Sequence, residues 1–201
     1  METILGRRSL ALDLTGLNER LTNYNRVMLD LGTGDGKFAF HYARTFPHHF
    51  VIGVDACREN LREHSRAKLA KLPNALLIIA SAQSLPDELN RLVSHITINF
   101  PWGSLLESLL NGDAMLMHSL ELISRSTTLI DVRLNGGALA EQGCALEDGA
   151  SRIYDNLIQA GWRMKSPVML NAQALHNFPS TWAKRLAFGR DPRAMQLSGC
   201  R

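Results

Sequence analysis

An acid followed by three glycines at alternate positions is the stretch best suited to chemistry: Asp30, Gly32, Gly34 and Gly36. Glycine lets the backbone turn tightly and approach a ligand closely, because a Cβ would collide there. A helix beginning near Gly36 would aim its free N–H groups at the loop. A phosphate-binding dinucleotide loop has its third glycine one residue later, as G-x-G-x-x-G. The observed spacing therefore suits a cationic, phosphate-free nucleotide ligand, with S-adenosylmethionine as the leading candidate.

A second acid, Asp55, ends an apolar run about 20 residues beyond the glycine loop. An acid at this place accepts hydrogen bonds from both ribose hydroxyls of a bound nucleoside. The competing interpretation is a helix N-cap, since Asp is favoured there and a helix is predicted from Arg58. We favour the ribose role because of the upstream loop. Residues 81–84, Ser-Ala-Gln-Ser, occupy the place where such folds contact adenine, although an ordinary polar turn fits them too.

The corner Asn99-Phe100-Pro101-Trp102 follows the fourth predicted strand. Ligands bind open α/β sheets at the carboxyl ends of the strands, so this corner is expected beside the ligand. Pro101 lacks an N–H and stiffens the turn, which leaves backbone carbonyls free to accept from an amino group. Trp102 offers a flat face for stacking. An adenine held there would present a nitrogen to a methyl donor; the competing interpretation is a core tryptophan.

Aromatic and cationic residues are interleaved in the run 179–190, Pro-Ser-Thr-Trp-Ala-Lys-Arg-Leu-Ala-Phe-Gly-Arg. That mixture suits a nucleic-acid surface, which combines base stacking with phosphate contacts. It also fits the start of a strand with solvated basic positions. A second basic cluster lies on the helix predicted over 58–72, where Glu59 and Glu63 could instead balance the cations on a solvated face.

The net charge of +3 is ordinary, but the charges are unevenly distributed. Residues 161–201 hold seven Lys or Arg against one acid, whereas residues 103–150 hold two against seven acids. The C-terminal part of the chain could therefore face a polyanion. The alternative is a surface on which these charges mix once the chain folds.

Alternating strand and helix patterns position these residues. Near-continuous apolar runs read as strands buried on both faces, and helical periodicities separate them. This alternation predicts an α/β fold with a parallel, doubly wound sheet. Two final strands without a full helix between them fit a class I S-adenosylmethionine-dependent methyltransferase, a Rossmann-like fold with a seven-stranded, mostly parallel sheet and an antiparallel terminal strand. The predicted strands are 27–31, 50–55, 75–80, 95–100, 127–134, 162–170 and 193–198; the predicted helices are 17–24, 37–45, 58–72, a short one from Pro86, 104–123 with a break at 111–112, and 148–160, with 135–147 as a loop.

Length and composition indicate one domain. A chain of 201 residues that is 45% hydrophobic can bury a sizeable core. We expect residues 26–201 to form the Rossmann-like core and residues 1–25 an extension with a hairpin over 3–14 and a helix. No run approaches the roughly 18 to 20 apolar residues of a membrane span, and no apolar signal region follows Arg7 and Arg8. A cytoplasmic protein without membrane contacts is expected.

The cysteines and histidines form no recognisable site. Cys57, Cys144 and Cys200 are widely spaced without a C-x-x-C pair, so idle thiols in a reducing cytoplasm are expected. The seven histidines are scattered apart from His48-His49, so no metal is predicted.

Three motifs are LDLGTGDGK at 29–37, FPWGSLLE at 100–107 and STWAKRLAFGR at 180–190, with GVDACRENL and ASAQSLP between them. Together they resemble the 16S ribosomal RNA adenine-1408 N1-methyltransferases that confer aminoglycoside resistance, over most of the chain. The pairing of a Phe-Pro-Trp-Gly corner with a C-terminal Trp-x-Lys/Arg-Arg motif is far more specific than the glycine loop. The resemblance is greatest to the pan-aminoglycoside-resistance member known from enterobacteria.

This resemblance implies S-adenosylmethionine-dependent methylation of adenine 1408 at N1, in the decoding-site helix of 16S rRNA within the assembled 30S subunit. It implies a monomer that needs no metal and releases S-adenosylhomocysteine. The target adenine would be flipped between Trp102 and Trp182, with its edge held by the Phe100 and Pro101 backbone and with Ser180 positioning Trp182. The implied cofactor contacts are Asp30, Gly32, Thr33, Gly34, Asp55, Ala82, Gln83 and Ser104. The implied rRNA contacts are Arg66, Lys68, Lys71, Lys184, Arg185 and Arg190.

Three features depart from the family pattern. Gln83 stands where Glu is expected, Asp191-Pro192 interrupts a tail that is more uniformly basic in relatives, and the 135–150 loop is short and acidic. Other functions are also compatible with the residues. They are another rRNA or tRNA methyltransferase, acting on guanine N7 or on an exocyclic adenine nitrogen, and a non-catalytic protein that keeps the fold and binds rRNA. The exocyclic enzymes have an Asn-Pro-Pro-aromatic corner, to which Asn-Phe-Pro-Trp is loosely similar.

Overall fold

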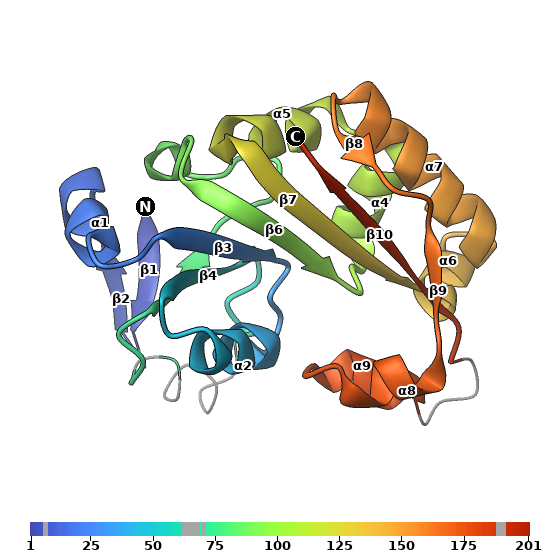
Figure 1. Ribbon diagram of the computed structural model, residues 1–201, viewed down its shortest axis with the longest axis horizontal. Coiled ribbons are helices and arrows are strands. Elements are labelled where there is room, and N and C mark those ends of the chain that lie inside the picture. Colours follow the sequence, from blue (N-terminus) through green and yellow to red (C-terminus); the bar gives the residue numbers. More distant parts are fainter. Residues whose placement is uncertain (6–7, 62–68, 70, 188–191) are drawn as a thin grey trace.

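A single twisted sheet forms the centre of the molecule in the computed structural model, which describes residues 1–201 apart from 6–7, 62–68, 70 and 188–191 (Figure 1). The strand order is β2-β1-β5-β4-β3-β6-β7-β10-β8, and β9 also pairs with β10. The five strands from β5 to β7 in this order are parallel, and β10 is antiparallel to β7. The predicted α/β sheet with an antiparallel terminal strand is therefore confirmed. The bounds are β1 Glu2–Leu5, β2 Arg8–Ala11, β3 Arg26–Leu31, β4 His49–Asp55, β5 Ala75–Ile79, β6 Val93–Asn99, β7 Ser124–Asn135, β8 Arg163–Met164, β9 Val168–Leu170 and β10 Ala194–Cys200.

Both ends of the sheet differ in detail from the seven-stranded expectation. The predicted strand 162–170 is divided into β8 and β9, each paired antiparallel with β10. Pro167 lies between them and has no N–H to donate to a ladder, which explains the interruption. At the other edge the predicted N-terminal hairpin forms, and β1 pairs antiparallel with β5. The hairpin thus lengthens the sheet.

Most predicted helices form at the expected places. The break expected at 111–112 separates α4 from α5, where Gly112 has a φ of 61° and the Asp113 side chain accepts from the Leu116 N–H. The predicted helix 58–72 lies mostly outside the described residues. The bounds are α1 Leu14–Leu21, α2 Lys37–Thr45, α4 Gly103–Asn111, α5 Ala114–Ile123, α6 Gly136–Glu141, α7 Leu146–Gln159, α8 Ala172–Asn177 and α9 Thr181–Ala187, with the 3-10 turn η1 Asp87–Leu89.

Two segments form helices where the sequence patterns suggested a loop or the start of a strand. Residues 135–147, expected as a loop, contain α6, because the Asn135 side chain caps its first turn by accepting from Ala138 N. The start of a strand, the alternative for 179–190, is wrong for its described part, which forms α9. Ser180 Oγ accepts there from Ala183 N. Each of these caps depends on a single side chain and produces no periodic pattern, so the sequence patterns did not reveal these two short helices.

The two faces of the sheet are packed differently. Alternate residues such as Leu29, Ile96 and Ile130 face α4, α5 and α7 and form the main apolar core. On the opposite face α2 covers Met28 and Val51, with Ala39 and Ala43 facing the strands. Farther along that face the side chains are polar and bonded to one another, as described for the site below. The polar face therefore runs toward the carboxyl ends of β3, β6 and β7, where the site lies.

None of the described helices is long and apolar enough to cross a membrane. The cysteines Cys57, Cys144 and Cys200 are free.

Candidate functional site

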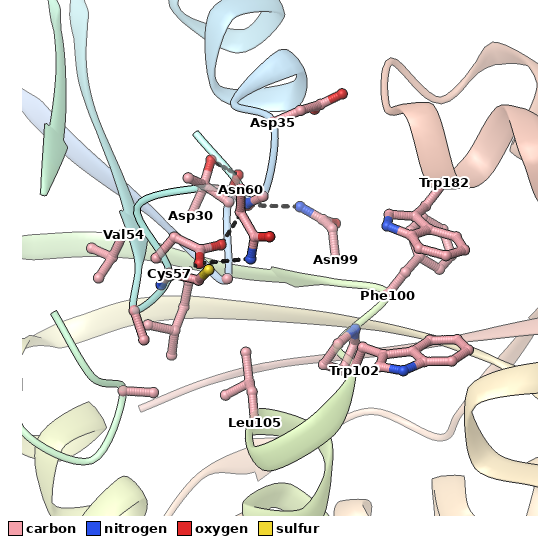
Figure 2. Close-up of a pocket in the computed structure, with 18 of the residues that line it drawn as sticks. Asp30, Asp35, Val54, Cys57, Asn60, Asn99, Phe100, Trp102, Leu105 and Trp182 are labelled. Carbon is pink, nitrogen blue, oxygen red and sulfur yellow. Dashed lines mark hydrogen bonds between the residues drawn. The ribbon is translucent and has the colours of Figure 1, made fainter. Parts of the chain in front are cut away.

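A cavity of about 560 Å³ opens at the carboxyl ends of β3, β4 and β6 (Figure 2). This volume lies in the usual range for small-molecule sites. Segments from the glycine loop, the β4 end, the Phe-Pro-Trp corner and the start of α9 line the cavity. The predicted site residues that line it are Asp30, Gly32, Thr33, Gly34, Asp55, Ala82, Gln83, Phe100, Pro101, Trp102, Ser104, Ser180, Trp182 and Arg185.

The glycine loop adopts a conformation that favours glycine at three positions. Gly32, Gly34 and Gly36 have φ values of 72°, 56° and 69°. A Cβ on Gly32 would lie 2.8 Å from the Leu105 side chain, whereas a Cβ on Gly34 would meet only a backbone oxygen at 4.0 Å. Two N–H groups of the loop, from Gly32 and Thr33, donate to the Val54 carbonyl. The loop is thus fixed to β4, with space beside Gly34.

Asp30 is buried at the floor of the cavity and its carboxylate is held by three side chains. Thr97 Oγ1 and Asn99 Nδ2 each donate to Oδ1 at 2.9 Å, and Thr33 Oγ1 donates to Oδ2 at 2.7 Å. Burial raises the pKa of Asp30 to about 6, although these hydrogen bonds and the positive charge of Arg133 oppose the rise. A cationic ligand group beside this carboxylate would favour its charged form.

Asp55 joins the glycine loop to the turn that follows β4. Its Oδ2 accepts from Gly34 N at 2.8 Å, and its Oδ1 accepts from Cys57 N at 2.9 Å and from Asn60 Nδ2 at 3.0 Å. The bond to Cys57 fits the capping role considered from the sequence, while the bond to Gly34 and the cavity-lining position fit the ligand role. We call residues 32–34 with Asp30 and Asp55 the acidic cradle.

Gln83, the neutral replacement at an expected acidic position, is held by neighbouring side chains. Gln83 Nε2 donates to Ser108 Oγ at 2.8 Å, and its Oε1 accepts from Ser81 Oγ at 2.5 Å. The amide therefore serves as donor and acceptor at the wall of the cavity, without adding negative charge.

Trp102 and Trp182 stack on each other at the other side of the cavity (Figure 2). Their ring centroids are 5.5 Å apart and the rings are inclined by 16°. Their exposed fractions are 44% and 43%, high values for such large apolar side chains. We call them the tryptophan pair. Trp102 immediately precedes α4 and Trp182 is the second residue of α9, so tertiary folding brings two distant motifs together.

The corner before Trp102 is strained. Phe100 has a φ of 55°, in the left-handed region that non-glycine residues rarely adopt, and its N–H donates to the Arg133 carbonyl at 2.7 Å. Such backbone strain persists only where surrounding contacts hold it, and it clusters at functional sites. Pro101 follows and fixes the direction of the chain into Trp102.

Phe178 ties the α8–α9 segment to three other parts of the site. Its ring stacks on Phe38 of α2 with centroids 5.1 Å apart, and it meets Phe100 edge-on at 5.8 Å. The Arg133 guanidinium lies 4.6 Å from the centre of the Phe178 ring and donates to Asn99 Oδ1 at 2.9 Å. Since Asn99 in turn donates to Asp30, polar and aromatic contacts connect the acidic cradle to the segment that carries Trp182.

The sequence interpretation assigned no role to several of these residues. Asn99 stood in the quoted corner, so its position was visible in the sequence but its hydrogen-bond partners were not. Phe38 and Arg133 carried no signal, and Arg133 belongs to the acid-rich part of the chain. These contacts join residues far apart in sequence, which motif spacing does not encode.

The predicted rRNA-contacting residues are only partly described. Lys71, Lys184 and Arg185 are exposed, and the Arg185 guanidinium lies 5.3 Å from the centre of the Trp182 ring. Arg66, Lys68 and Arg190 lie outside the described residues. Two cations of the predicted surface thus lie on α9 with Trp182.

Among the described residues, no group of three or more His, Cys, Asp or Glu side chains is arranged to hold a metal ion.

Comparisons with known proteins place the whole chain in one family. The family model of NpmA, 16S rRNA (adenine(1408)-N(1))-methyltransferase, matches residues 2–201. The Escherichia coli 16S rRNA (adenine(1408)-N(1))-methyltransferase is 31% identical, over 99% of this chain and 98% of the relative. The crystal structure of the 16S rRNA methyltransferase KamB is 28% identical with a TM-score of 0.87, covering 100% of this chain and 99% of that one.

A third relative extends the comparison to a bound ligand. It is the W203A mutant of the 16S rRNA (adenine(1408)-N(1))-methyltransferase from Catenulisporales acidiphilia, whose crystal structure contains the cosubstrate SAM. The TM-score is 0.87 and the match covers 100% of this chain and 96% of that one, at 21% identity. This likeness shows a common class I methyltransferase fold.

Proposed function

Because this chain belongs to the 16S rRNA (adenine(1408)-N(1))-methyltransferase family, we propose that it methylates N1 of adenine 1408 in the assembled 30S subunit and thereby confers aminoglycoside resistance. We further propose that it acts in the cytoplasm as a monomer, with S-adenosylmethionine as methyl donor and S-adenosylhomocysteine as product. The observation that carries the proposal is the stacked tryptophan pair beside an acidic cradle in one cavity.

The acidic cradle fits S-adenosylmethionine in size, charge and shape. Asp30 would accept from the cationic amino group, Asp55 from the ribose hydroxyls, and the open side of Gly34 leaves room for the ligand. Ala82, Gln83 and Ser104 line the wall where the adenine ring would lie. Bound S-adenosylmethionine supplies a methyl group already activated by its sulfonium. The residues of this chain need only hold it and exclude water.

The tryptophan pair would receive the flipped target base. A base between two rings, in van der Waals contact of about 3.5 Å with each, requires ring planes about 7 Å apart. The centroids are 5.5 Å apart, so the indoles must separate before a base can enter. Until then each ring covers a face of the other, which reduces the apolar surface exposed to water.

Little acid–base chemistry is required of the protein. Adenine N1 carries a free lone pair, so no general base is needed, and the described residues contribute chiefly by alignment. Methylated adenine is cationic, and a cation between two indole faces is favourable. Removing the base from its helix costs a few kcal/mol, which stacking at about 1–3 kcal/mol per base offsets.

Basic residues would hold the rRNA backbone. Lys71, Lys184 and Arg185 are exposed and available for phosphates, and we propose the same role for Arg66, Lys68 and Arg190 from the sequence alone. Phosphate contacts of this kind fix position and orientation rather than sequence. The choice of adenine 1408 would then depend on the folded shape of the 30S subunit.

Primer extension on 16S rRNA from cells that express the protein tests the proposal. We expect a stop next to adenine 1408, and faster methylation of purified 30S subunits than of free 16S rRNA. An unmodified adenine 1408, with modification at a guanine or an exocyclic nitrogen elsewhere, would instead support the other methyltransferase functions. A non-catalytic rRNA-binding protein would give no modification and, by calorimetry, no S-adenosylmethionine binding.

A further inference from the structure

We propose that Thr181 and Asp35 form a latch between α9 and the glycine loop, and that this latch positions Trp182 for the base. The inference rests on the function proposed above and adds a positioning role for two residues outside its assigned contacts. Thr181 Oγ1 donates to Asp35 Oδ2 at 2.7 Å, a bond that spans 146 residues of sequence. A hydrogen bond to a carboxylate is among the stronger side-chain contacts.

The Asp35 carboxylate is oriented by the glycine loop itself. Asp35 lies between Gly34 and Gly36, both with positive φ, so the backbone on each side has a defined course. Its Oδ1 accepts from Lys37 N at 3.1 Å in the first turn of α2. The other oxygen is thereby turned toward α9. Any ligand that orders the loop also orders this acceptor.

The Thr181 hydroxyl is not needed to build α9. Ser180 already caps the helix, since its Oγ accepts from Ala183 N at 3.0 Å. The Thr181 bond instead leaves the helix and crosses to the loop. The next residue is Trp182, which stacks on Trp102 and has an exposed fraction of 43%. Because the Trp182 indole is only partly buried, its own packing holds it weakly. Fixing Thr181 therefore restricts the position of this indole.

A second contact joins the neighbouring segments, α2 and the turn between α8 and α9, and makes the latch separable from folding. Phe38 of α2 stacks on Phe178, with ring planes inclined by 8°. Leu175 and Ala183 are fully buried in a small apolar cluster with Phe100. The α8–α9 segment should therefore stay packed when the Thr181 hydroxyl is removed. Only the placement of Trp182 relative to the loop should change.

The test is Thr181→Val, which keeps the shape of the side chain and removes its hydroxyl. With 30S subunits as substrate we expect kcat to fall about 10-fold, the order of one lost hydrogen bond to a charged group. The KM for S-adenosylmethionine and the melting temperature should change little. Thr181→Ser should restore most of the activity. The matched control is Thr22→Val, because Thr22, just after α1, donates its Oγ1 to a local acceptor, Asn18 O, at 3.1 Å.

Hydrogen–deuterium exchange on the protein without cofactor provides a readout besides activity. We expect the first-turn amides of α9 to exchange faster in Thr181→Val and in Asp35→Ala than in wild type. In the double variant they should exchange no faster than in the more affected single variant. Additive losses, a kcat within twofold of wild type, or an equal loss of S-adenosylmethionine affinity in Thr181→Val would overturn the latch. A wild-type protein that leaves adenine 1408 unmodified would overturn the proposed function instead.

Discussion

The acidic cradle and the tryptophan pair line the same cavity but are built in opposite ways. In the cradle, Asp30 is buried and accepts from three side chains, and Asp55 accepts from two backbone N–H groups and an amide. The tryptophan pair is nearly half exposed and its members contact each other. The cradle therefore resembles a finished ligand site, whereas the pair must open before it can hold a base.

This difference follows from what each region has to recognise. A small charged ligand needs fixed hydrogen-bond acceptors in a site shielded from water, because desolvated charges interact strongly. A base within a large rRNA surface is delivered by the partner, so exposed aromatic faces suit it better than a closed pocket. A mutation within one region should leave the other largely unchanged, except at the residues that connect the two regions. The following experiments test this expectation from the largest expected effect to the smallest.

Trp182→Ala should break the tryptophan pair and leave the acidic cradle intact. Loss of stacking and of alignment together should lower methylation of 30S subunits at least about 1,000-fold, while the Kd for S-adenosylmethionine stays within about threefold. Methylation assays and calorimetry measure the two effects. Phe46→Ala is the matched control, because Phe46 is also 43% exposed but lies at the end of α2. Normal methylation by Trp182→Ala would refute the sandwich.

Asp55→Ala should break the cradle and spare the pair. Loss of the ribose acceptor and of the bond to Gly34 N should weaken S-adenosylmethionine binding about 100-fold by calorimetry. Binding to 30S subunits, measured by filter retention, should change little because the basic surface is untouched. Asp87→Ala, on the distant turn η1, is the control acid. An unchanged Kd in Asp55→Ala would remove Asp55 from the cofactor site.

Acidification should weaken the cradle alone. The pKa of Asp30 is raised to about 6, so its carboxylate is charged above pH 6 and takes up a proton below it. The Kd for S-adenosylmethionine should be lowest near pH 7, and it should rise toward tenfold per unit below pH 6. Asp30→Asn should bind more weakly without this slope. A constant wild-type Kd from pH 5 to 8 would contradict the assignment of the cationic group to Asp30.

Asn99→Ala should cause the smallest change, and it probes the connection between the two regions. It removes a donor from Asp30 and an acceptor from Arg133. We expect the pKa of Asp30 to rise further, so S-adenosylmethionine binding at pH 7 should weaken about threefold to tenfold. In a Trp162→Phe background the remaining fluorescence comes from the tryptophan pair, and it should also shift if Arg133 no longer holds Phe178. A variant with unchanged affinity and fluorescence would show that the regions are not coupled there.

Much of the fold was predictable from the sequence because strands buried on both faces carry continuous apolar runs. The succession of strands along the chain, and the positions of Asp30, Asp55 and Trp102 at or just beyond strand ends, follow from that pattern. The helix α6 and the division into β8 and β9 did not follow. Asn135 acts as a single cap and Pro167 interrupts a ladder, and each is one residue in a segment without clear periodicity.

The sequence by itself determined the kinds of groups at the site: an acid before a glycine loop, a second acid, and two tryptophans in recognisable motifs. These are local properties, because positive φ, capping and strand ends depend on neighbouring residues. Only the tertiary structure decided that the tryptophans stack, that burial raises the pKa of Asp30, and that Thr181 reaches Asp35. Those facts depend on distances between segments far apart in the chain, and packing alone sets such distances.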